Sequence, residues 1–363
     1  MNLSLYKLDR NQINIIKGIA IVIIVLHNFL HVISGVKEND ISYDFNEFLR
    51  FLSVVADNPL TIFNSVLSYF GHFGVELFVF SSGFGLTKKY MANDKISYKD
   101  YIVPRFTKIY SLMLFGLIVI FSILFYKYTF EQMLKISVWF LSMLKNLSYT
   151  RIYSDFGVWW FFSLIVQLYL LFPFLYKYID KKKEQGFYIL LIAVYALIYV
   201  LFPITERFNI PMFGNFLGHL PEFLLGIAIA RLDSLRINIK YVMLALVVFV
   251  SANLTGYMFP FGFLSAAILL LFIFYPIYNN SKGRIAKAFL FLGNISMFMF
   301  LFNGSLREFT IPFFRGQSPL FITLGSFGHL VFVIVFSYLA SIVFNKTMKP
   351  LSQKIINKIL HNE

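Results

Sequence analysis

INIIKGIAIVIIVLHNFLHVI, at residues 13–33, is an apolar segment with no turn signal. Isoleucine, valine, leucine and phenylalanine lie on every face of the helix that this segment predicts, a pattern typical of a membrane span. Lys17 lies near its start and His27 lies deep inside it. An ionisable side chain in hydrocarbon is costly, so His27 is a candidate functional residue by default. The competing interpretation is that His27 only hydrogen-bonds a neighbouring helix.

The composition of the whole chain agrees with this reading of its first helix. Of 363 residues, 58% are hydrophobic, 20% are aromatic and only 14% are charged. A soluble domain cannot bury so many apolar side chains, so the sequence predicts an all-α fold, a polytopic transmembrane helical bundle. The chain has no cysteine, which excludes disulfides, cysteine-ligated metals and a cysteine acyl-enzyme. The net charge of +14 is concentrated in loops on one side, so it does not indicate nucleic-acid binding.

Further apolar runs of spanning length follow, each bounded by charge, proline or glycine. We expect spans at about 66–86, 109–126, 157–176, 187–203, 214–230, 241–258, 262–278, 288–306 and 326–345, which with the first helix makes about ten. No internal repeat is visible. The sequence therefore predicts one membrane domain, residues 1–346, followed by a cationic tail, residues 347–363.

The distribution of basic residues predicts the orientation. Most of the 32 Lys and Arg residues fall on one side, in the N-terminus, 87–108, 177–186, 231–240, 279–287 and the C-terminus. The positive-inside rule then places both termini in the cytoplasm. Residues 132–148 would invert this topology if they spanned the membrane, but with Lys135 and Lys145 they fit an amphipathic segment on the outer face better. The tail is likewise expected to lie on the inner leaflet.

The second predicted span, SYFGHFGVELFVFSSGFGL at residues 68–86, places His72 and Glu76 among apolar residues. Counted from the inner ends of their helices, His27 and His72 both lie about 21 Å up, with Glu76 about one turn lower. A carboxylate beside an imidazole fixes its tautomer and stabilises the imidazolium. Glu76 is therefore a candidate support for a histidine that acts as general base. The alternative is that His72 and Glu76 only hold helices together.

A basic pair lies at the start of the third predicted span, in YKDYIVPRFTKIYSLML at residues 98–114. Arg105 and Lys108 are three residues apart, so they share one helix face at the membrane surface. Two cations there suit the phosphate oxygens of a nucleotide-bearing donor. Positive-inside loops also produce such pairs routinely, and by itself the pair does not decide between the two interpretations.

Together, these stretches resemble the acyltransferase-3 family, integral membrane O-acyltransferases that decorate cell-envelope and exported glycans. KGIAIVIIVLH is similar to the family's first span with its functional histidine, GVELFVFSSGF to its second span, and PRFTKIY to its basic pair. VWWFFSLIVQLYLLFP, PEFLLGIAIA and LGNISMFMFLF resemble later spans. The matching positions are His27, Gly74, Glu76, Ser82, Gly83, Phe84, Arg105, Lys108, Trp160, Tyr169, Pro173, Glu222 and Gly226.

The chain departs from the family pattern at four positions. Lys108 stands where the family usually has arginine, which loses bidentate geometry toward a phosphate. Asn14 stands where the first helix often begins with an acidic residue, Asn303 where a histidine is frequent, and Glu76 where aspartate is common. None of these departures removes His27.

The resemblance implies transfer of an acyl group, most often acetyl, from cytoplasmic acyl-coenzyme A to a hydroxyl of a lipid-linked or exported glycan. The expected location is the plasma membrane of a bacterium, and capsule O-acetylation is one such reaction. Lys17, Arg105 and Lys108 would hold the coenzyme A phosphates, and His27 would act as general base or transient acyl carrier, oriented by Glu76. His72, Ser82, Trp160 and Glu222 are further candidate site residues, among which Ser82 lacks a neighbouring base and fits helix packing better than a nucleophile.

Two other functions are compatible with parts of the sequence. A polysaccharide transporter, flippase or polymerase would share the apolar spans and the glycan partner, but no matched pair of broken helices is visible. A metal enzyme would use His27 and His31, which are four residues apart on one helix face. Because no glutamate lies between them and no third ligand is evident on that helix, the sequence predicts no metal site.

Overall fold

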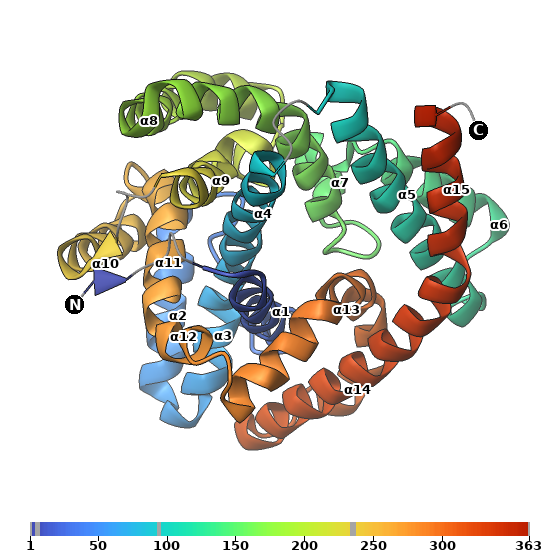
Figure 1. Ribbon diagram of the computed structural model, residues 1–363. Helices are drawn as coiled ribbons and strands as arrows, with labels where there is room; N and C mark the ends of the chain where they lie inside the picture. Colours follow the sequence, from blue (N-terminus) through green and yellow to red (C-terminus); the bar gives the residue numbers. More distant parts are fainter. Residues whose placement is uncertain (1, 4–7, 93–95, 233–236, 362–363) are drawn as a thin grey trace.

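The computed structural model describes residues 2–3, 8–92, 96–232 and 237–361, and it is almost entirely helical (Figure 1). The α-helices are α1 (Arg10–Ile33), α2 (Phe45–Asp57), α3 (Ile62–Phe70), α4 (Gly74–Met91), α5 (Tyr98–Ile123), α6 (Phe130–Leu141), α7 (Tyr149–Ile152), α8 (Trp160–Arg207), α9 (Phe216–Arg231), α10 (Ile239–Leu254), α11 (Phe259–Ile273), α12 (Tyr275–Asn279), α13 (Arg284–Phe314), α14 (Pro319–Lys346) and α15 (Met348–His361). The short strands β1 (Asn2–Leu3) and β2 (Ile237–Asn238) pair antiparallel. The predicted all-α fold is confirmed.

Six helical segments among the described residues are long and apolar enough to cross a membrane: Arg10–Ile33, Pro59–Met91, Tyr98–Ile123, Trp160–Arg207, Arg284–Phe314 and Pro319–Lys346. The ten ranges expected from the sequence fall mostly on helical residues, but 66–86 covers α3, a 3₁₀ turn and α4, and 262–278 covers α11 and α12. Two of them share α8, which bends at Lys183, where φ is 56° and ψ is −137°. The helices α9, α10 and α11 have only 15 or 16 residues each. The number of membrane crossings and the cytoplasmic termini stay predictions.

Helix α1 lies at the centre of the bundle, with α3, α4, α13 and α14 around it (Figure 1). Its first turn is fixed by Asp9, whose carboxylate accepts a hydrogen bond from the backbone N–H of Gln12, while the backbone N–H of Asp9 donates to the Gln12 side-chain oxygen. This reciprocal capping satisfies two of the free backbone N–H groups at the helix start. The apolar residues on every face of α1 are explained by this central position, since helices cover most of its surface.

Helices α1 and α13 cross in backbone contact. A Cβ atom added to Gly18 would lie 1.9 Å from the carbonyl oxygen of Phe289, and one added to Gly293 would lie 1.8 Å from that of Asn14. Small residues at a crossing let two helix backbones approach to contact distance, a common way of holding membrane helices together. The side chains of Asn14 and Asn294 hydrogen-bond across the same crossing at 3.0 Å.

We expect Gly293→Val to destabilise the protein by at least ~2 kcal/mol, because the overlap is with backbone and no side-chain rotation relieves it. The measurement is the thermal unfolding midpoint and the monodisperse yield of purified protein. Gly328→Val is the matched control, since a Cβ at Gly328 meets nothing within 4 Å. Equal stability of the two variants would show that α1 and α13 do not depend on this close crossing.

The segment 132–148 is not among the candidate spans of the described residues. Its helix α6 has 12 residues and ends at Leu141, followed by Met143 with a φ of 58°. Lys145 is not a solvated charge of this segment, because its side chain is 1% exposed, donates to the Ser154 carbonyl and lies over the Phe140 ring. Burial lowers the pKa of Lys145 to about 7. The segment thus packs onto the protein by its C-terminal end.

The expected cationic tail forms α15, which packs along α5 (Figure 1). The Ser352 hydroxyl donates to that of Ser111 at 2.7 Å, and Ser352 is buried. The tail is therefore helical, and it is attached to the helical domain through α5. Its position on the inner leaflet stays a prediction.

Candidate active site

His27, in the C-terminal half of α1, has a defined hydrogen-bonding state. Its Nδ1 atom lies 3.0 Å from the carbonyl oxygen of Leu67 on α3. A carbonyl can only accept, so Nδ1 carries the proton and the lone pair of the neutral ring is on Nε2. His27 as a whole residue is 5% exposed, so its ring is largely buried.

The loop after α1 returns toward the two histidines of this helix. Gly35 has a φ of +72°, the left-handed conformation that ends many helices. The chain is then held by the Ser68 hydroxyl, which donates to the carbonyl of Val36 at 2.6 Å, and by Asn39, which donates to the Tyr69 hydroxyl at 3.0 Å. These contacts fix Glu38, between Val36 and Asn39, above the end of α1.

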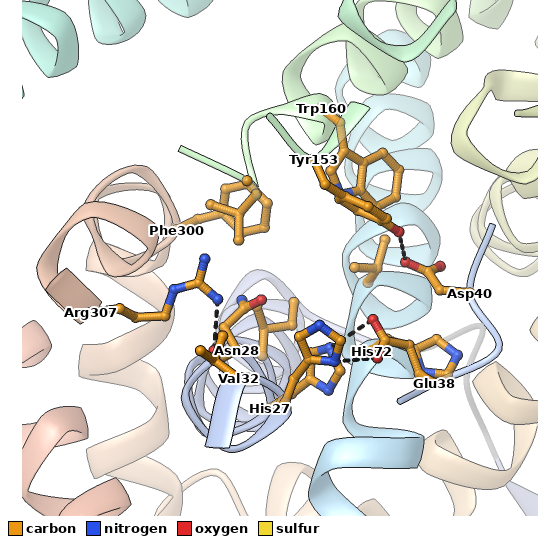
Figure 2. Close-up of a pocket in the computed structure, with 15 residues that line it drawn as sticks. His27, Asn28, Val32, Glu38, Asp40, His72, Tyr153, Trp160, Phe300 and Arg307 are labelled. Carbon is orange, nitrogen blue, oxygen red and sulfur yellow. Dashed lines mark hydrogen bonds and ion pairs between the residues drawn. The ribbon is translucent and has the colours of Figure 1, made fainter. Parts of the chain in front are cut away.

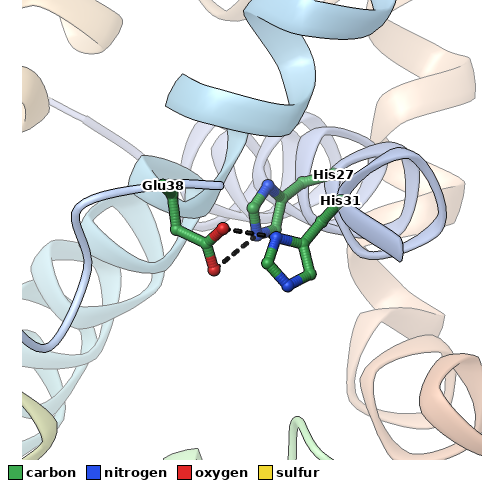
Figure 3. A group of neighbouring side chains, drawn as sticks. All are labelled: His27, His31 and Glu38. Carbon is green, nitrogen blue, oxygen red and sulfur yellow. Dashed lines mark ion pairs between the residues drawn. The ribbon is translucent and has the colours of Figure 1, made fainter. Parts of the chain in front are cut away.

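Glu38 faces His27 and His31 (Figure 3). One carboxylate oxygen lies 3.9 Å from Nε2 of His27, and the other forms an ion pair with Nδ1 of His31. Burial alone would raise the pKa of Glu38, but the hydrogen bond with His31 and the charges of the neighbouring histidines lower it to about 2. Glu38 is therefore ionised at neutral pH and stabilises positive charge on His27.

These three residues open into a pocket of about 210 Å³ (Figure 2). Its lining residues are Ile24, His27, Asn28, His31, Val32, Glu38, Asp40, His72, Val75, Tyr153, Gly157, Val158, Trp160, Phe300 and Arg307. Aromatic rings, carboxylates and a guanidinium thus share one concave surface with the histidine side chains. Such a combination of apolar and convergent polar groups is typical of a small-molecule site.

Arg307 of α13 lies across the pocket from the Glu38 side (Figure 2). Its Nη1 atom donates to the Asn28 carbonyl at 2.7 Å, and Nε donates to that of Gly304 at 3.3 Å. Gly157, with a φ of +60°, gives the guanidinium room, since a Cβ there would lie 3.2 Å from Nη2. The guanidinium therefore has a fixed position and a further N–H face toward the pocket.

Asp40 and Tyr153 form another part of the pocket wall. The Tyr153 hydroxyl donates a hydrogen bond of 2.5 Å to the Asp40 carboxylate (Figure 2). Burial, together with the negative charge of Glu38, raises the pKa of Asp40 to about 7. Asp40 is therefore able to accept or donate a hydrogen bond at neutral pH. Trp160 lies beside this pair, as expected for a platform that stacks on an apolar ring face.

Of the residues expected from the sequence, His72 lies where the helix geometry placed it. Its ring centroid is 5.9 Å from that of His27, and both line the pocket. Glu76 does not contact His27 among the described contacts, and its partner is Nδ1 of His219 on α9, at 3.1 Å. The expected Glu76–His27 pairing is thus corrected. A 3₁₀ turn at Gly71–Phe73 interrupts the helix, which offsets Glu76 from the face that carries His72.

The remaining candidates lie in different places. Trp160 lines the pocket, whereas Glu222 is fully buried on α9 beside Glu76 and His219. Ser82 shares a hydrogen bond with the Tyr169 hydroxyl and has no contact with a histidine among the described residues. This agrees with the packing role that the sequence suggested for Ser82.

The expected phosphate-binding residues are divided between two places. Lys108 lies close enough to Lys17, Lys89 and Lys349 for their charges to interact, and we call these four residues the lysine cluster. Arg105 is not part of this cluster, because its guanidinium lies over the Tyr101 ring, 3.8 Å from the centroid, and donates to the Tyr101 carbonyl. The spacing of Arg105 and Lys108 along the helix does not indicate this local stacking.

Glu38, Asp40, Tyr153 and Arg307 were not singled out from the sequence. A signal existed for Glu38, since a glycine that ends the helix is followed three residues later by an acid, in SGVKEND. Glu38 also supplies the third potential ligand that α1 lacks, since one ligand atom each from His27, His31 and Glu38 lie within 4.8 Å of one another. Nothing in the sequence pattern indicates Arg307, whose partner Asn28 is 279 residues away in the chain.

Comparison with known proteins gives one result. A family model described as an acyltransferase domain matches residues 10–346. No curated protein and no solved structure matches the chain significantly. The matched region runs from α1 to the end of α14 and contains every residue that lines the pocket.

Proposed function

The chain belongs to the acyltransferase-3 family of multi-pass membrane proteins, and on that basis we propose that it transfers an acyl group, most often acetyl, from acyl-coenzyme A to a hydroxyl of a cell-surface or lipid-linked glycan. The observation that carries the proposal is the Nε2 lone pair of His27, which lies in a pocket beside the ionised Glu38. The proposed setting is a bacterial plasma membrane, with the donor in the cytoplasm and both termini on that side.

In the proposed reaction His27 acts as general base. Its Nε2 takes the proton of the acceptor hydroxyl while that oxygen attacks the thioester carbonyl. The carbon–sulfur bond then breaks, and the coenzyme A thiolate leaves with the proton from the imidazolium. Glu38 stabilises the imidazolium, the part that an aspartate plays toward a catalytic histidine elsewhere. In the covalent version, Nε2 attacks the thioester carbonyl and the coenzyme A thiolate leaves; the acceptor hydroxyl then takes the acyl group from Nε2, and its proton ends on the thiolate.

Arg307 supports the step in which negative charge appears. A tetrahedral intermediate places a full charge on the former carbonyl oxygen, and fixed donors in a water-poor site stabilise such a charge strongly. Arg307 is held by two backbone carbonyls and faces the pocket, so its position does not have to be established during the reaction. The aromatic wall of Trp160 and Tyr153 suits the apolar face of a sugar ring.

The donor is proposed to bind at the lysine cluster. Lys17 and His27 are ten residues apart on α1, so their Cα atoms are separated by about 15 Å along the helix axis. An extended pantetheine arm covers such a distance, with the coenzyme A phosphates at Lys17 and Lys108. Lys349 contributes from the tail, which gives α15 a part in donor binding. Arg105 would contact the donor only if its guanidinium moved away from Tyr101.

The test is transfer of labelled acetyl groups from acetyl-coenzyme A to glycan by the purified protein in liposomes, together with ester-linked acetyl on surface polysaccharide in a deletion strain. Label that depends on the protein supports the proposal. Trapping acyl-protein without acceptor separates the covalent version from direct transfer. If acetylation never depends on the protein while polymer amount or length does, the acyltransferase proposal is wrong and a transport or polymerase role replaces it.

Lys108→Ala is expected to raise the KM for acyl-coenzyme A about tenfold with a small change in kcat. A hydrogen bond to a charged group contributes roughly 1.5–3 kcal/mol, and 1.4 kcal/mol corresponds to a factor of ten. The measurement is the initial rate against donor concentration. Lys135→Ala is the matched control, since Lys135 is exposed and paired only with Glu131 in the described structure. An unchanged KM would place the donor away from the lysine cluster.

A further inference from the structure

A second polar group is buried behind the pocket wall. Glu76 of α4 and His219 and Glu222 of α9 are each at most 1% exposed. One ligand atom from each of the three lies within 4.8 Å of the others. Trp160, which lines the pocket, has its ring 5.8 Å from that of His219, and Phe263 of α11 lies 5.5 Å away on edge. We call Glu76, His219 and Glu222 the buried triad.

The polar atoms of the buried triad do not all have hydrogen-bond or ion-pair partners among the described residues. Glu76 has one partner, Nδ1 of His219, at 3.1 Å. Neither carboxylate oxygen of Glu222 has a hydrogen-bond partner among the described residues, although both are inaccessible. No Lys or Arg of the described chain forms an ion pair with either glutamate. An unpaired carboxylate in an apolar interior is strongly unfavourable, so the two glutamates are neutralised either by protons or by a bound cation.

The backbone holds the two carboxylates in this position. A Cβ atom added to Gly83 of α4 would lie 2.3 Å from the Phe223 carbonyl oxygen, and one added to Gly226 of α9 would lie 2.3 Å from that of Phe80. The two helices are therefore in backbone contact one to two turns from Glu76 and Glu222. His219 and Glu222 are three residues apart, which places them on one face of α9. The two glutamates cannot separate without breaking this crossing.

We propose that the buried triad binds a divalent transition-metal ion, with zinc as the first choice. Zinc accepts both imidazole nitrogen and carboxylate oxygen as ligands, and three protein ligands leave one of its four positions open. A divalent cation neutralises the two carboxylates together, and it satisfies the free oxygens of Glu222. This departs from the sequence-based expectation that the protein uses no metal.

The ion is distinct from the group around His27. In the His27, His31 and Glu38 group the carboxylate already has an ion-pair partner, whereas in the buried triad the Glu222 carboxylate has none. The ion is placed behind Trp160, where it links α4 to α9 and fixes the wall on which the acceptor is proposed to lie. Its role is structural support of the pocket rather than contact with the reacting atoms.

The experiment is the metal content of purified wild-type protein, measured after incubation with Zn²⁺ and removal of free ion. We expect about one zinc per chain in the wild type, and less than about a fifth of that in Glu222→Gln and in His219→Gln. In chelator-treated wild type, Zn²⁺ is expected to raise the unfolding midpoint by at least ~3 °C, with no rise in either variant. These readouts do not depend on acyl transfer, so they fail or succeed independently of the proposed function.

His31→Ala is the matched control, because it removes a ligand atom from the His27 group and none from the buried triad. Its zinc content and midpoint shift are expected to equal those of the wild type. Loss of zinc in His31→Ala with retention in Glu222→Gln would overturn the proposal and assign the ion to the pocket. Wild type that retains no zinc and shows no midpoint shift would also overturn it, and the buried triad would then hold protons instead. If Glu222→Gln does not fold, His219→Gln decides.

Discussion

His27→Ala is expected to reduce acyl transfer by about 10²–10⁴-fold, the range that a positioned general base contributes. The alanine removes the Nε2 nitrogen, whose lone pair lies in the pocket beside an ionised carboxylate. The Nδ1 hydrogen bond to Leu67 is lost as well, but α1 keeps its apolar contacts, so the variant should insert and fold. The measurement is kcat with acetyl-coenzyme A and glycan, at equal protein level in the membrane.

His329→Ala is the control for a buried histidine that does not line the pocket. His329 of α14 stacks on Phe29 and hydrogen-bonds the Thr310 hydroxyl at 2.9 Å. Its loss is expected to cost stability and to leave kcat within about threefold of the wild-type value per folded molecule, as for a change outside the site. Retained transfer in His27→Ala would refute the base and carrier roles together, because both need the same nitrogen.

Glu38→Gln is expected to lower kcat by about 10–100-fold while the KM for acyl-coenzyme A changes little. The amide keeps the shape of the side chain but carries no charge to stabilise the imidazolium that forms on His27. Because the pKa of Glu38 is about 2, the carboxylate is ionised throughout the physiological range, so the loss should be the same from pH 6 to pH 8. Steady-state rates at three pH values measure this.

Glu131→Gln serves as control for Glu38→Gln, since Glu131 is 75% exposed and pairs with Lys135. Glu76→Gln provides the comparison that separates the two assignments of the acid. If kcat falls further in Glu76→Gln than in Glu38→Gln while the unfolding midpoint is unchanged, the sequence-based pairing of Glu76 with His27 is right after all. A fall that accompanies a lower midpoint fits the buried triad instead.

The helices were predictable because a long apolar run in a membrane must satisfy its own backbone hydrogen bonds, and a helix does so within one segment. The common level of His27 and His72 was predictable too, since helix rise alone decides it and the 5.9 Å between their rings agrees. Rotation about the helix axis was not predictable. One 3₁₀ turn at Gly71–Phe73 was enough to direct Glu76 toward α9, and no hydropathy pattern indicates such a turn.

Side chains on loops and distant helices were also beyond sequence reasoning. Glu38 reaches His27 only because Gly35 reverses the chain and Ser68 and Asn39 hold the loop. Arg307 reaches the pocket through the packing of α13 on α1, a contact between opposite ends of the chain. Contacts of this kind depend on tertiary packing, which overrides local pattern.

The crossing of α1 with α13 has a consequence for biosynthesis. The ribosome adds about 5–20 residues per second, so the 279 residues between Asn28 and Arg307 take roughly tens of seconds to make. During that time α1 is in the bilayer with Lys17 and His27 but without the helix that contacts Gly18. A nascent chain that ends before Arg307 lacks one of the residues that line the pocket. We therefore expect a newly made molecule to gain its proposed activity only after α13 has inserted, so that chains that stop before Arg307 have none.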